Sequence, residues 1–594
     1  MADSNRAKVS EKTDKPKDFK YVAGRLWEYI YQYKWRVATA LFLTILSNLL
    51  ALVGPLLSGY AIDAIEPGKG KVIFYKVFYY AAWMILFYII SSVLSYVLSI
   101  LMLRLSQKIV RKMRDDVFTK LVDLPVGYFD RNPAGEIISR ISYDIDTVNT
   151  SMSTDVIQIL SSVITVVGSF IMMIIISPEL VLIMVLTIPL FILYTRYITK
   201  KVRPFFKKRS VKLGELNGFV EEMVSGQKTI KAYAAEESIM DRFNQKNEEA
   251  VEAYYKAEYY GSITGPTVNF INNLSLSFVT VIGAILFLFH QLSLGNISSF
   301  VQYSRRFSGP ISEAANIFSD LQSAAAAAER VFKLLDEQIE PKDRENAITL
   351  KEVQGNVEFN QVSFGYVPDR MIIKGLSLLA KPAGLVAIVG PTGAGKTTII
   401  NLLMRFYDVW EGEIRIDDNE NRDITRSSLR KSYAMVLQDS WLFQGSFYEN
   451  IAYGREEATM EEVIGAAKMV GMHSFIKRLP NGYDTIVNED GINISKGQKQ
   501  LLTIARAMLL DANMLILDEA TSNVDTRTEI KIQKAMRKLM EHKTCFVIAH
   551  RLSTIQGADN ILVIDQGNIV EQGDHRELMD KKGFYYRLYH AQFE

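Results

Sequence analysis

The sequence predicts an all-α domain of six membrane-spanning helices with long cytoplasmic helical extensions, followed by an α/β domain. Residues 37–62 and 77–103 contain no Asp, Glu, Lys or Arg, and each run exceeds the roughly 20 residues that cross a bilayer core as a helix. Hydrophobic residues make up 48% of the 594-residue chain and charged residues still make up 23%, so a polar part must accompany the apolar part. A glycine-rich loop at 390–397, between a strand-like run and a helical run, marks the α/β part.

The glycine-rich loop has the sequence Gly390-Pro391-Thr392-Gly393-Ala394-Gly395-Lys396-Thr397. It follows an apolar strand at 385–389 and leads into a helix from Thr398, which is the context that a P-loop requires. Glycines let backbone N–H groups approach the phosphates of a nucleotide, and the start of the helix favours their negative charge. Lys396 is expected to neutralise the β- and γ-phosphate oxygens and Thr397 to bind Mg²⁺. The predicted ligands are therefore ATP and Mg²⁺, and an ordinary glycine-rich turn is the alternative interpretation.

An acidic pair follows the apolar strand at 514–517. Asp518 and Glu519 stand at its carboxyl end, the edge at which α/β sheets bind their ligands. We expect Asp518 to hold Mg²⁺ through water and Glu519 to polarise the attacking water. By itself, an apolar strand followed by two acids is weak evidence.

Four further runs are candidates for the remaining spans. Residues 156–178 and 180–195 form a pair around Glu179, and 259–290 is a long uncharged stretch. The run at 291–304 is the weakest candidate, because Arg305 and Arg306 follow it directly. These runs alone allow five or six spans. Six is the consistent number, because the polar N-terminus and a nucleotide-binding domain must both face the cytoplasm, as the Lys- and Arg-rich segments after the second and fourth spans also indicate.

Changes in composition predict the domain boundaries. Residues 1–20 are polar and lysine-rich, which predicts a disordered cytoplasmic tail and not a signal peptide. The transmembrane domain is expected at 21–330, starting with an amphipathic helix at 21–35 in the inner membrane interface. A linker at 331–350 and the nucleotide-binding domain at 351–594 follow. Two helical hairpins are predicted below the membrane, with turns at 124–129 and near 212–215.

The order of these motifs resembles the ATP-binding cassette (ABC) exporters, in the half-transporter arrangement in which six spans precede one nucleotide-binding domain. The segment Ile494-Ser495-Lys496-Gly497-Gln498, between the P-loop and the acidic strand, stands where that family has its signature. The resemblance implies that two such domains close head to tail around ATP. Ser495, Gly497 and Gln498 would then serve the nucleotide of the partner chain.

The resemblance also implies roles for residues outside the two strongest motifs. Their individual side chains have simpler interpretations, such as a core tyrosine, a polar loop residue, a solvated glutamate or a structural histidine. In the family's pattern, Tyr366 binds adenine, Gln438 senses Mg²⁺ and Glu489 couples to the membrane domain. Asp525 lies in the loop that crosses the dimer interface, and His550 contacts the γ-phosphate.

The signature departs from the usual Leu-Ser-Gly-Gly-Gln of the family at Ile494 and Lys496. A bulky cation would crowd an approach built for glycine. The signature of this chain is altered, whereas its own acidic and switch residues are complete. In this respect the chain resembles the catalytically intact member of a bacterial heterodimeric multidrug exporter. A tolerated substitution in a homodimer is the alternative. Asn523 also departs from the usual alanine.

The cargo is the least specified property. The spans carry Tyr, Phe, Met and amides such as Asn269, Asn273 and Gln302, which could line a cavity or pack helix on helix. Multidrug efflux of hydrophobic or amphipathic small molecules across a bacterial plasma membrane is the leading prediction from the resemblance, and lipid or lipopeptide flipping is the rival. Soluble ABC proteins lack spans, and uptake systems usually carry their ATPase as a separate chain. The net charge of +2 carries no information about nucleic-acid or acidic partners, and no nucleic-acid partner is expected. The single cysteine, Cys545, excludes an internal disulfide.

Overall fold

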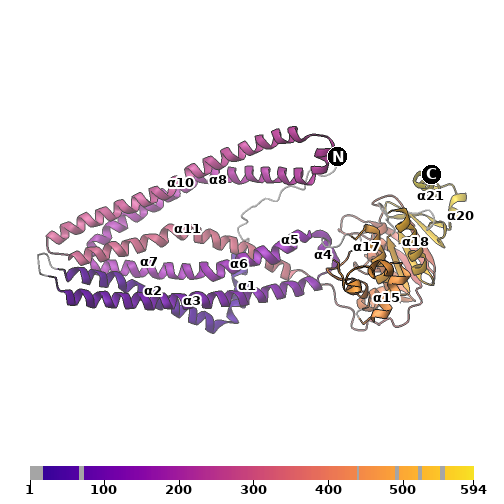
Figure 1. Ribbon diagram of the computed structural model, residues 1–594, viewed down its shortest axis with the longest axis horizontal. Coiled ribbons are helices and arrows are strands. Elements are labelled where there is room, and N and C mark those ends of the chain that lie inside the picture. The colour runs from indigo at the N-terminus through magenta and orange to yellow at the C-terminus, as the bar shows by residue number, and fades with distance from the viewer. Residues whose placement is uncertain are drawn as a thin grey trace. The chain divides into compact units, whose positions relative to one another are not determined.

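The computed structural model describes residues 18–65, 72–437, 441–455, 457–487, 494–518, 525–548 and 555–593 (Figure 1). These residues form two compact units. The first comprises the described residues up to Asp123 together with Pro133–Gln338, and the second comprises Leu124–Asn132 together with the described residues from Ile339 onward. The predicted linker at 331–350 stays a prediction.

The first unit is built almost entirely from helices, several of them far longer than a bilayer is thick (Figure 1). Residues 134–176 form one helical path, with π-helical turns at Arg140–Asp144 and Ser151–Asp155. The helices are α1 (Phe19–Tyr31), α2 (Lys34–Asp63), α3 (Phe74–Asp123), α5 (Ala134–Ser139), α6 (Ile145–Thr150), α7 (Val156–Ile176), α8 (Pro178–Ser225), α9 (Gln227–Ala232), α10 (Glu236–Leu288) and α11 (Leu294–Asp336).

Within the described residues, four helical stretches are long and apolar enough to cross a membrane, namely Lys34–Asp63, Phe74–Asp123, Ala134–Ile176 and Glu236–Leu288. They carry four of the predicted spans. The other two fall on α8 and α11, and the total of six stays a prediction. The expected amphipathic helix at 21–35 corresponds to α1 over most of its length, but α1 ends at Tyr31 and α2 already begins at Lys34. The side chain of Asp18 caps the first turn of α1.

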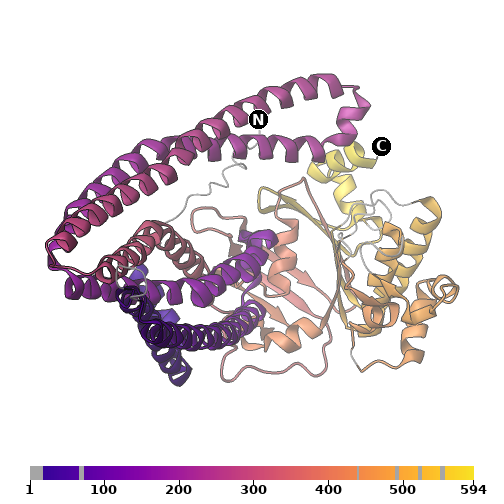
Figure 2. The same cartoon turned by 60° about the vertical axis from the view of Figure 1, so that its left-hand side comes forward.

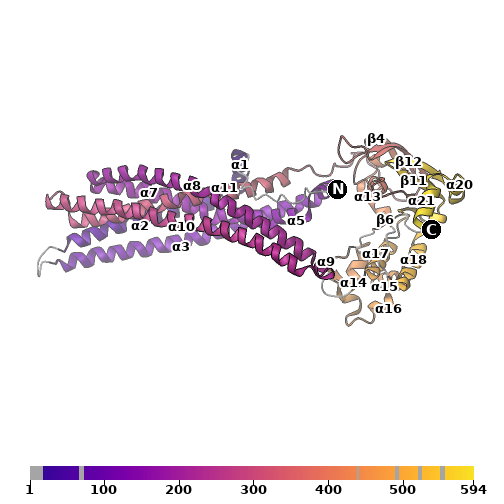
Figure 3. The same ribbon diagram turned by 90° about the horizontal axis from the view of Figure 1, so that it is seen from above.

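The two predicted cytoplasmic hairpins have different outcomes. The first turn is confirmed, because α3 ends at Asp123 and a short helix begins directly after Pro125. The second turn, near 212–215, is wrong, because α8 runs without a break to Ser225 and the chain reverses at residues 226–235. Lys212 lies 2.8 Å from both Glu215 and Glu249, so pairing with α10 holds this part of α8 helical. Figures 1 and 3 show α8 and α10 side by side.

Polar contacts join α11 to the backbone of α2. Pro55 lies inside α2 and lacks the N–H that would bond the carbonyl of Ala51. Arg306 of α11 donates to that carbonyl instead, with its Nη1 2.9 Å from the oxygen. The hydroxyl of Tyr303 bonds the next carbonyl, that of Leu52. Arg306 thus supplies the donor that Pro55 lacks for the Ala51 carbonyl, and Tyr303 adds a bond at the neighbouring carbonyl.

The second unit contains two principal β-sheets. A four-stranded antiparallel sheet has the order β2-β1-β4-β5, and a six-stranded sheet has the order β12-β11-β3-β10-β9-β6, in which only β12 runs antiparallel. The strands are β1 (Val357–Phe364), β2 (Ile373–Ala380), β3 (Leu385–Val389), β4 (Glu411–Ile416), β5 (Asn419–Glu420), β6 (Tyr433–Val436), β7 (Gly445–Ser446), β8 (Ile486–Val487), β9 (Met514–Asp518), β10 (Thr544–Ile548), β11 (Asn560–Asp565) and β12 (Asn568–Gly573).

Both faces of the six-stranded sheet are buried, which explains why its strands are continuously apolar. Alternate strand residues face opposite cores, so Val386 and Ile388 pack with the α12 side while Ala387 and Val389 pack with the α17 side. Figure 2 shows helices on both sides of the sheet. The helices of this unit are α4 (Val126–Arg131), α12 (Lys396–Leu403), α13 (Arg426–Lys431), α14 (Phe447–Ala452), α15 (Met460–Met469), α16 (His473–Ile476), α17 (Lys496–Leu510), α18 (Thr526–Met540), α20 (His575–Asp580) and α21 (Phe584–Phe593).

Candidate nucleotide-binding site

The glycine-rich loop joins β3 to α12, as predicted. Gly390, Gly393 and Gly395 have φ angles of +155°, +84° and +107°, which lie in the region that side chains disfavour. A Cβ on Gly390 would also stand 2.2 Å from the carbonyl oxygen of Ile564, so that position has no room for any other residue. A Cβ on Gly393 would meet nothing within 4 Å, which leaves open space beside the loop. The loop can therefore admit a ligand close to its backbone.

Lys396 is the first residue of α12, and its side chain folds back over the loop. Its Nζ donates to the carbonyl oxygens of Gly390 and Pro391, at 2.8 and 3.0 Å. Burial lowers the pKa of Lys396, and the negative charge of Asp518 opposes that shift. The ammonium group thus stands over the loop, near a carboxylate at the end of another strand. A bound phosphate would give it a stronger partner than two neutral carbonyls.

The donors available for Mg²⁺ are hard oxygen atoms. Thr397 is exposed in the first turn of α12, and Asp518 is half-buried at the carboxyl end of β9. In the part of the chain that the structure describes, no group of three His, Cys, Asp or Glu side chains forms a metal site of its own. One hydroxyl and one carboxylate suit a Mg²⁺ ion that takes its other ligands from phosphate and water.

Tyr366 follows β1 and lies against the start of α12. Its hydroxyl donates to Thr398 Oγ1 at 3.2 Å and accepts from Asn401 Nδ2 at 2.9 Å. The ring packs edge-on against Tyr407 at 5.0 Å, yet 42% of the residue stays exposed. This places an aromatic surface beside the P-loop, where a nucleotide base can stack.

The start of α17 has a complete capping box. Ser495 Oγ accepts from the N–H of Gln498 at 3.2 Å, and the Gln498 side chain accepts from the N–H of Ser495 at 3.0 Å. Gly497 is buried, whereas Lys496 is exposed. The predicted signature residues therefore begin a helix, and the side chain of Lys496 points away from the core.

Comparison with known proteins identifies the family. Residues 37–311 match the family model described as the ABC transporter transmembrane region, and residues 373–522 match that described as ABC transporter. A Bacillus subtilis protein, the uncharacterised ABC transporter ATP-binding protein YfiC, is 44% identical over 98% of this chain and 96% of its own length. The chain belongs to the ABC transporters.

Other comparisons make it an exporter half-transporter with ATPase activity. The solved structure of a bacterial Atm1-family ABC exporter with ATP bound aligns with a TM-score of 0.74 and 30% identity, over 94% of this chain and 98% of that one. The fatty acid ABC transporter of Mycobacterium bovis is 46% identical over 82% of this chain and 76% of its own. A more distant relative in Syntrophus aciditrophicus, named ATP-dependent lipid A-core flippase, is 32% identical over 86% of this chain and 85% of its own. The putative multidrug export protein YgaD of Bacillus subtilis is 34% identical over 96% of this chain and 99% of its own.

Several residues that the ABC exporter pattern assigns to the site lie outside the described residues, namely Gln438, Glu489, Glu519, Asn523 and His550. Their roles stay predictions. The strands that lead to three of them end at Val436, Asp518 and Ile548, which are neighbours at the carboxyl edge of one parallel sheet. Asp525 is described, and it caps α18 by accepting from the N–H of Thr528, a bond that lowers the pKa of its carboxyl.

Tyr407 is a residue that the sequence analysis missed. It packs against Tyr366 on one side, and its hydroxyl donates to Asp130 of α4 on the other, at 2.5 Å. Gly127 of α4 lies so close that a Cβ there would stand 2.9 Å from the Tyr407 ring. One ring thus connects the predicted adenine platform of this ABC transporter to a helix that lies between α3 and α5 in the sequence. No local motif marks such a contact.

Proposed function

We propose that this chain is one half of a dimeric exporter that moves amphipathic small molecules out of a bacterial cell, with multidrug efflux as the leading cargo class. Both termini and the ATPase domain would face the cytoplasm. The proposal rests on the family, on relatives named as multidrug and lipid transporters, and on the charge distribution along α11.

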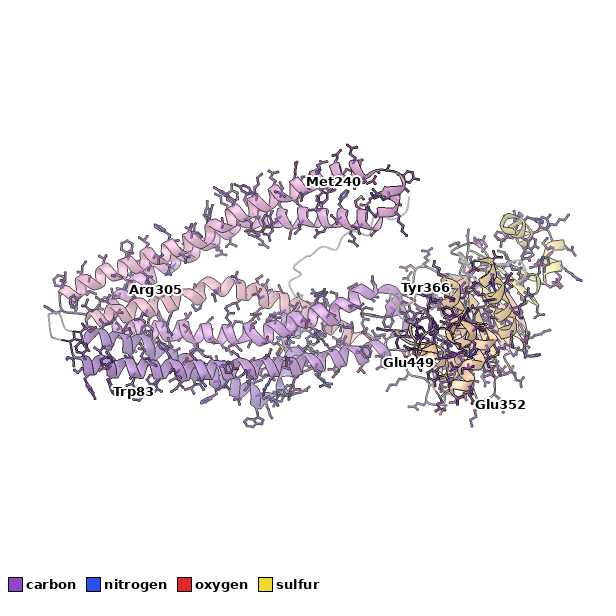
Figure 4. The ribbon with its side chains drawn as sticks, in the orientation of Figure 1. Trp83, Met240, Arg305, Glu352, Tyr366 and Glu449 are labelled. Carbon is purple, nitrogen blue, oxygen red and sulfur yellow. The ribbon has the colours of Figure 1, made fainter. Side chains whose placement is uncertain are left out.

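The observation that carries the proposal is a charged face on α11. Its packed face is apolar and fully buried, with Phe300, Tyr303 and Phe307 against the bundle. Arg305, Glu313 and Asp320 lie on the opposite face and are exposed. Figure 4 shows Arg305 on its helix. Arg305 stands 11 residues after Leu294, about 17 Å along the helix and so near the middle of a bilayer roughly 30 Å thick.

An arginine at this depth is too costly to place in lipid. A single arginine at the centre of a spanning helix costs about 2.5–3.5 kcal/mol on insertion scales. Intramembrane charges therefore face a partner or a water-filled path. Apolar surface beside Arg305, Glu313 and Asp320 would suit cargo that is itself part apolar and part polar.

Energy for transport would come from ATP held between two chains. In this chain Lys396 would bind the phosphates, Glu519 would polarise the attacking water, and Gln438 and His550 would sense the γ-phosphate and its metal. Thr397 and Asp518 would hold Mg²⁺, which supplies charge neutralisation on the phosphates. Ser495, Gly497 and Gln498 would complete the nucleotide site of the partner chain.

The partner is proposed to be a different half-transporter, because Lys496 alters the signature while this chain's own acidic and switch residues are present. A homodimer is the alternative. Lipid or lipopeptide translocation is the second candidate function, favoured by the relatives named as a fatty acid transporter and a lipid A-core flippase.

The test is drug-stimulated ATPase activity in lipid vesicles, measured for this chain alone and for the chain co-expressed with a neighbouring half-transporter. Stimulation by amphipathic dyes that also accumulate across the membrane supports drug export. Stimulation and flipping of labelled lipids with no response to dyes would favour the second candidate.

Two further comparisons complete that test. Activity in the co-expressed pair but not in the single chain supports the heterodimer, and full activity of the single chain would refute it. Glu519→Gln is expected to retain ATP binding and to lose most turnover, and near-normal hydrolysis by this variant would contradict the role given to Glu519.

A further inference from the structure

Two consecutive arginines of α11 have different surroundings. Arg306 is half-buried, and it donates to the carbonyl oxygen of Ala51 at 2.9 Å and to the hydroxyl of Tyr88 at 3.4 Å. Arg305 is exposed, and no hydrogen bond or ion pair joins its guanidinium to another of the described residues. Within the described part of the chain, one of the two charges is therefore satisfied and the other is open to a ligand.

Arg305 lies near the middle of the membrane, about 17 Å along α11. The neighbouring α2 gives the same depth. Its last residue, Asp63, accepts from Ser293 Oγ at 2.6 Å and from the N–H of Gly295 at 2.7 Å, so the two helices are level at this end. Ala51, the partner of the second arginine, is 12 residues before the end of α2 and so about 18 Å from it.

Insertion into the membrane does not account for an arginine at this depth. The positive-inside bias concerns cations near the ends of spans. A hydrocarbon core about 30 Å thick leaves roughly 15 Å on either side of its centre, which is further than an arginine side chain reaches. Because a charge without a partner is costly in lipid, Arg305 must face a water-filled path or an anion.

The surface beside Arg305 has room for an anion. Gly309 lies one turn further along the same face of α11, and a Cβ there would meet nothing within 4 Å. The next carboxylate along α11, that of Glu313, is two turns away, about 12 Å along the axis. Its Oε2 accepts from Gln158 Nε2 of α7 at 3.0 Å. Glu313 is thus held by α7 and makes no ion pair with Arg305.

We propose that Arg305 binds the anionic headgroup of the cargo, so that this exporter favours amphipathic anions with a carboxylate or phosphate group. The inference rests on the proposed export of amphipathic molecules and adds the sign of the cargo's charge. A guanidinium presents a planar fork of donors that matches carboxylate and phosphate oxygens. Charge attraction is also stronger inside the membrane than at its surface, because the surroundings have a lower dielectric constant.

The experiment measures stimulation of ATPase activity by four probes with the same apolar tail, using the assembled exporter in lipid vesicles at about pH 8, where carboxylic acids are ionised. Dodecanoate and dodecyl phosphate are anions, methyl dodecanoate is neutral and dodecyltrimethylammonium is a cation. The half-maximal concentration is expressed as probe in the membrane, so that partitioning does not affect the comparison. For the unaltered exporter it should be lowest for one of the two anions, and this anion identifies the headgroup.

The test variant is Arg305→Gln, which removes the charge. It should raise the half-maximal concentration of the preferred anion about 10-fold, because a charge-assisted bond is lost, and leave that of methyl dodecanoate unchanged. Arg305→Lys keeps the charge and should stay within about threefold of the unaltered exporter.

Arg104→Gln is the matched control. Arg104 is also exposed, and it has no hydrogen bond or ion pair with another of the described residues. It stands 30 residues after Phe74, the first residue of α3, about 45 Å along the helix and so beyond the hydrocarbon core. This control removes the same charge and should leave the responses to all four probes unchanged.

Several outcomes would overturn the role of Arg305. One is an equal rise for the preferred anion and the methyl ester in Arg305→Gln, which would indicate a structural role or a contact with the partner chain. Preference of the unaltered exporter for the cation is another, and competition by acetate as strong as that by dodecanoate is a third. In these cases the proposed export of amphipathic molecules still stands. Stimulation by none of the probes would refute that function and the role of Arg305 with it.

Discussion

Arg306 gives a quantitative test of how α2 and α11 are held together. The sequence presents it as a charge that interrupts a span, whereas in the structure its Nη1 lies 2.9 Å from the carbonyl oxygen of Ala51. That carbonyl has no partner at Pro55, which lacks an N–H. If the pairing is the reason for Arg306, restoring the N–H by Pro55→Ala should make the arginine dispensable.

The prediction is a coupling energy between Arg306→Met and Pro55→Ala. Interhelical hydrogen bonds in membranes average about 0.6 kcal/mol and reach about 1.7, and bonds from charged donors lie towards the upper end, so we expect about 1 kcal/mol. The cost of Arg306→Met alone combines a lost bond with relief of a half-buried charge. Only the difference between the two backgrounds isolates the bond.

The assay is reversible unfolding in mixed detergent micelles of the unaltered chain, the two single variants and the double variant. Arg305→Met provides the control, because Arg305 lies on the exposed face of α11 and its coupling to Pro55→Ala should be near zero. A coupling energy for Arg306 below about 0.3 kcal/mol, or one equal to that of Arg305, would refute the capping of the Ala51 carbonyl.

Three further predictions concern the second unit. Lys396→Met should weaken binding of a fluorescent ATP analogue by about 10- to 100-fold, because a charge-assisted phosphate bond is lost, and unchanged affinity would contradict the P-loop geometry. Tyr407→Phe should keep basal ATPase activity and lower the stimulation of ATPase activity by cargo severalfold, since it removes only the bond to Asp130 of α4. Full stimulation in this variant would show that the contact takes no part in coupling cargo binding to ATP hydrolysis. Burial raises the pKa of the Cys545 thiol from 9.0 to about 12. The neutral thiol therefore contributes to folding stability below pH 9, and this contribution is lost as the pH rises to 12. Maleimide labelling of Cys545 at pH 8 should be far slower in the folded chain than in denaturant, and equal rates would show that the thiol is accessible.

The P-loop could be predicted from sequence because its chemistry is local. The positive φ angles of Gly390, Gly393 and Gly395 are a property of consecutive residues, and the strand before them and the helix after them are equally local signals. The end of α3 at Asp123 was predictable for the same reason, since Pro125 disfavours a helical conformation at the residue before it.

The turn placed near Gly214 was wrong because a glycine in a helix costs only about 1 kcal/mol. The ion pairs that Lys212 makes with Glu215 and Glu249 and the packing of α8 along α10 offset such a cost, and α10 is remote in sequence. The same limitation hid Tyr407, whose partner Asp130 lies 277 residues earlier. Contacts of this kind carry no local pattern.

The capping box of α17 bears on whether Lys496 weakens a nucleotide site. Its two bonds satisfy the N–H groups of Ser495 and Gln498, and the N–H groups of Lys496 and Gly497 take no part in it. The first N–H groups of a helix bind anions whatever side chain the residue carries. Replacement of glycine by Lys496 therefore leaves the backbone donors in place and adds a positive charge beside them. In the proposed dimer the substitution would act through crowding by its exposed side chain, so its effect would depend on the space that the partner chain's P-loop leaves opposite it.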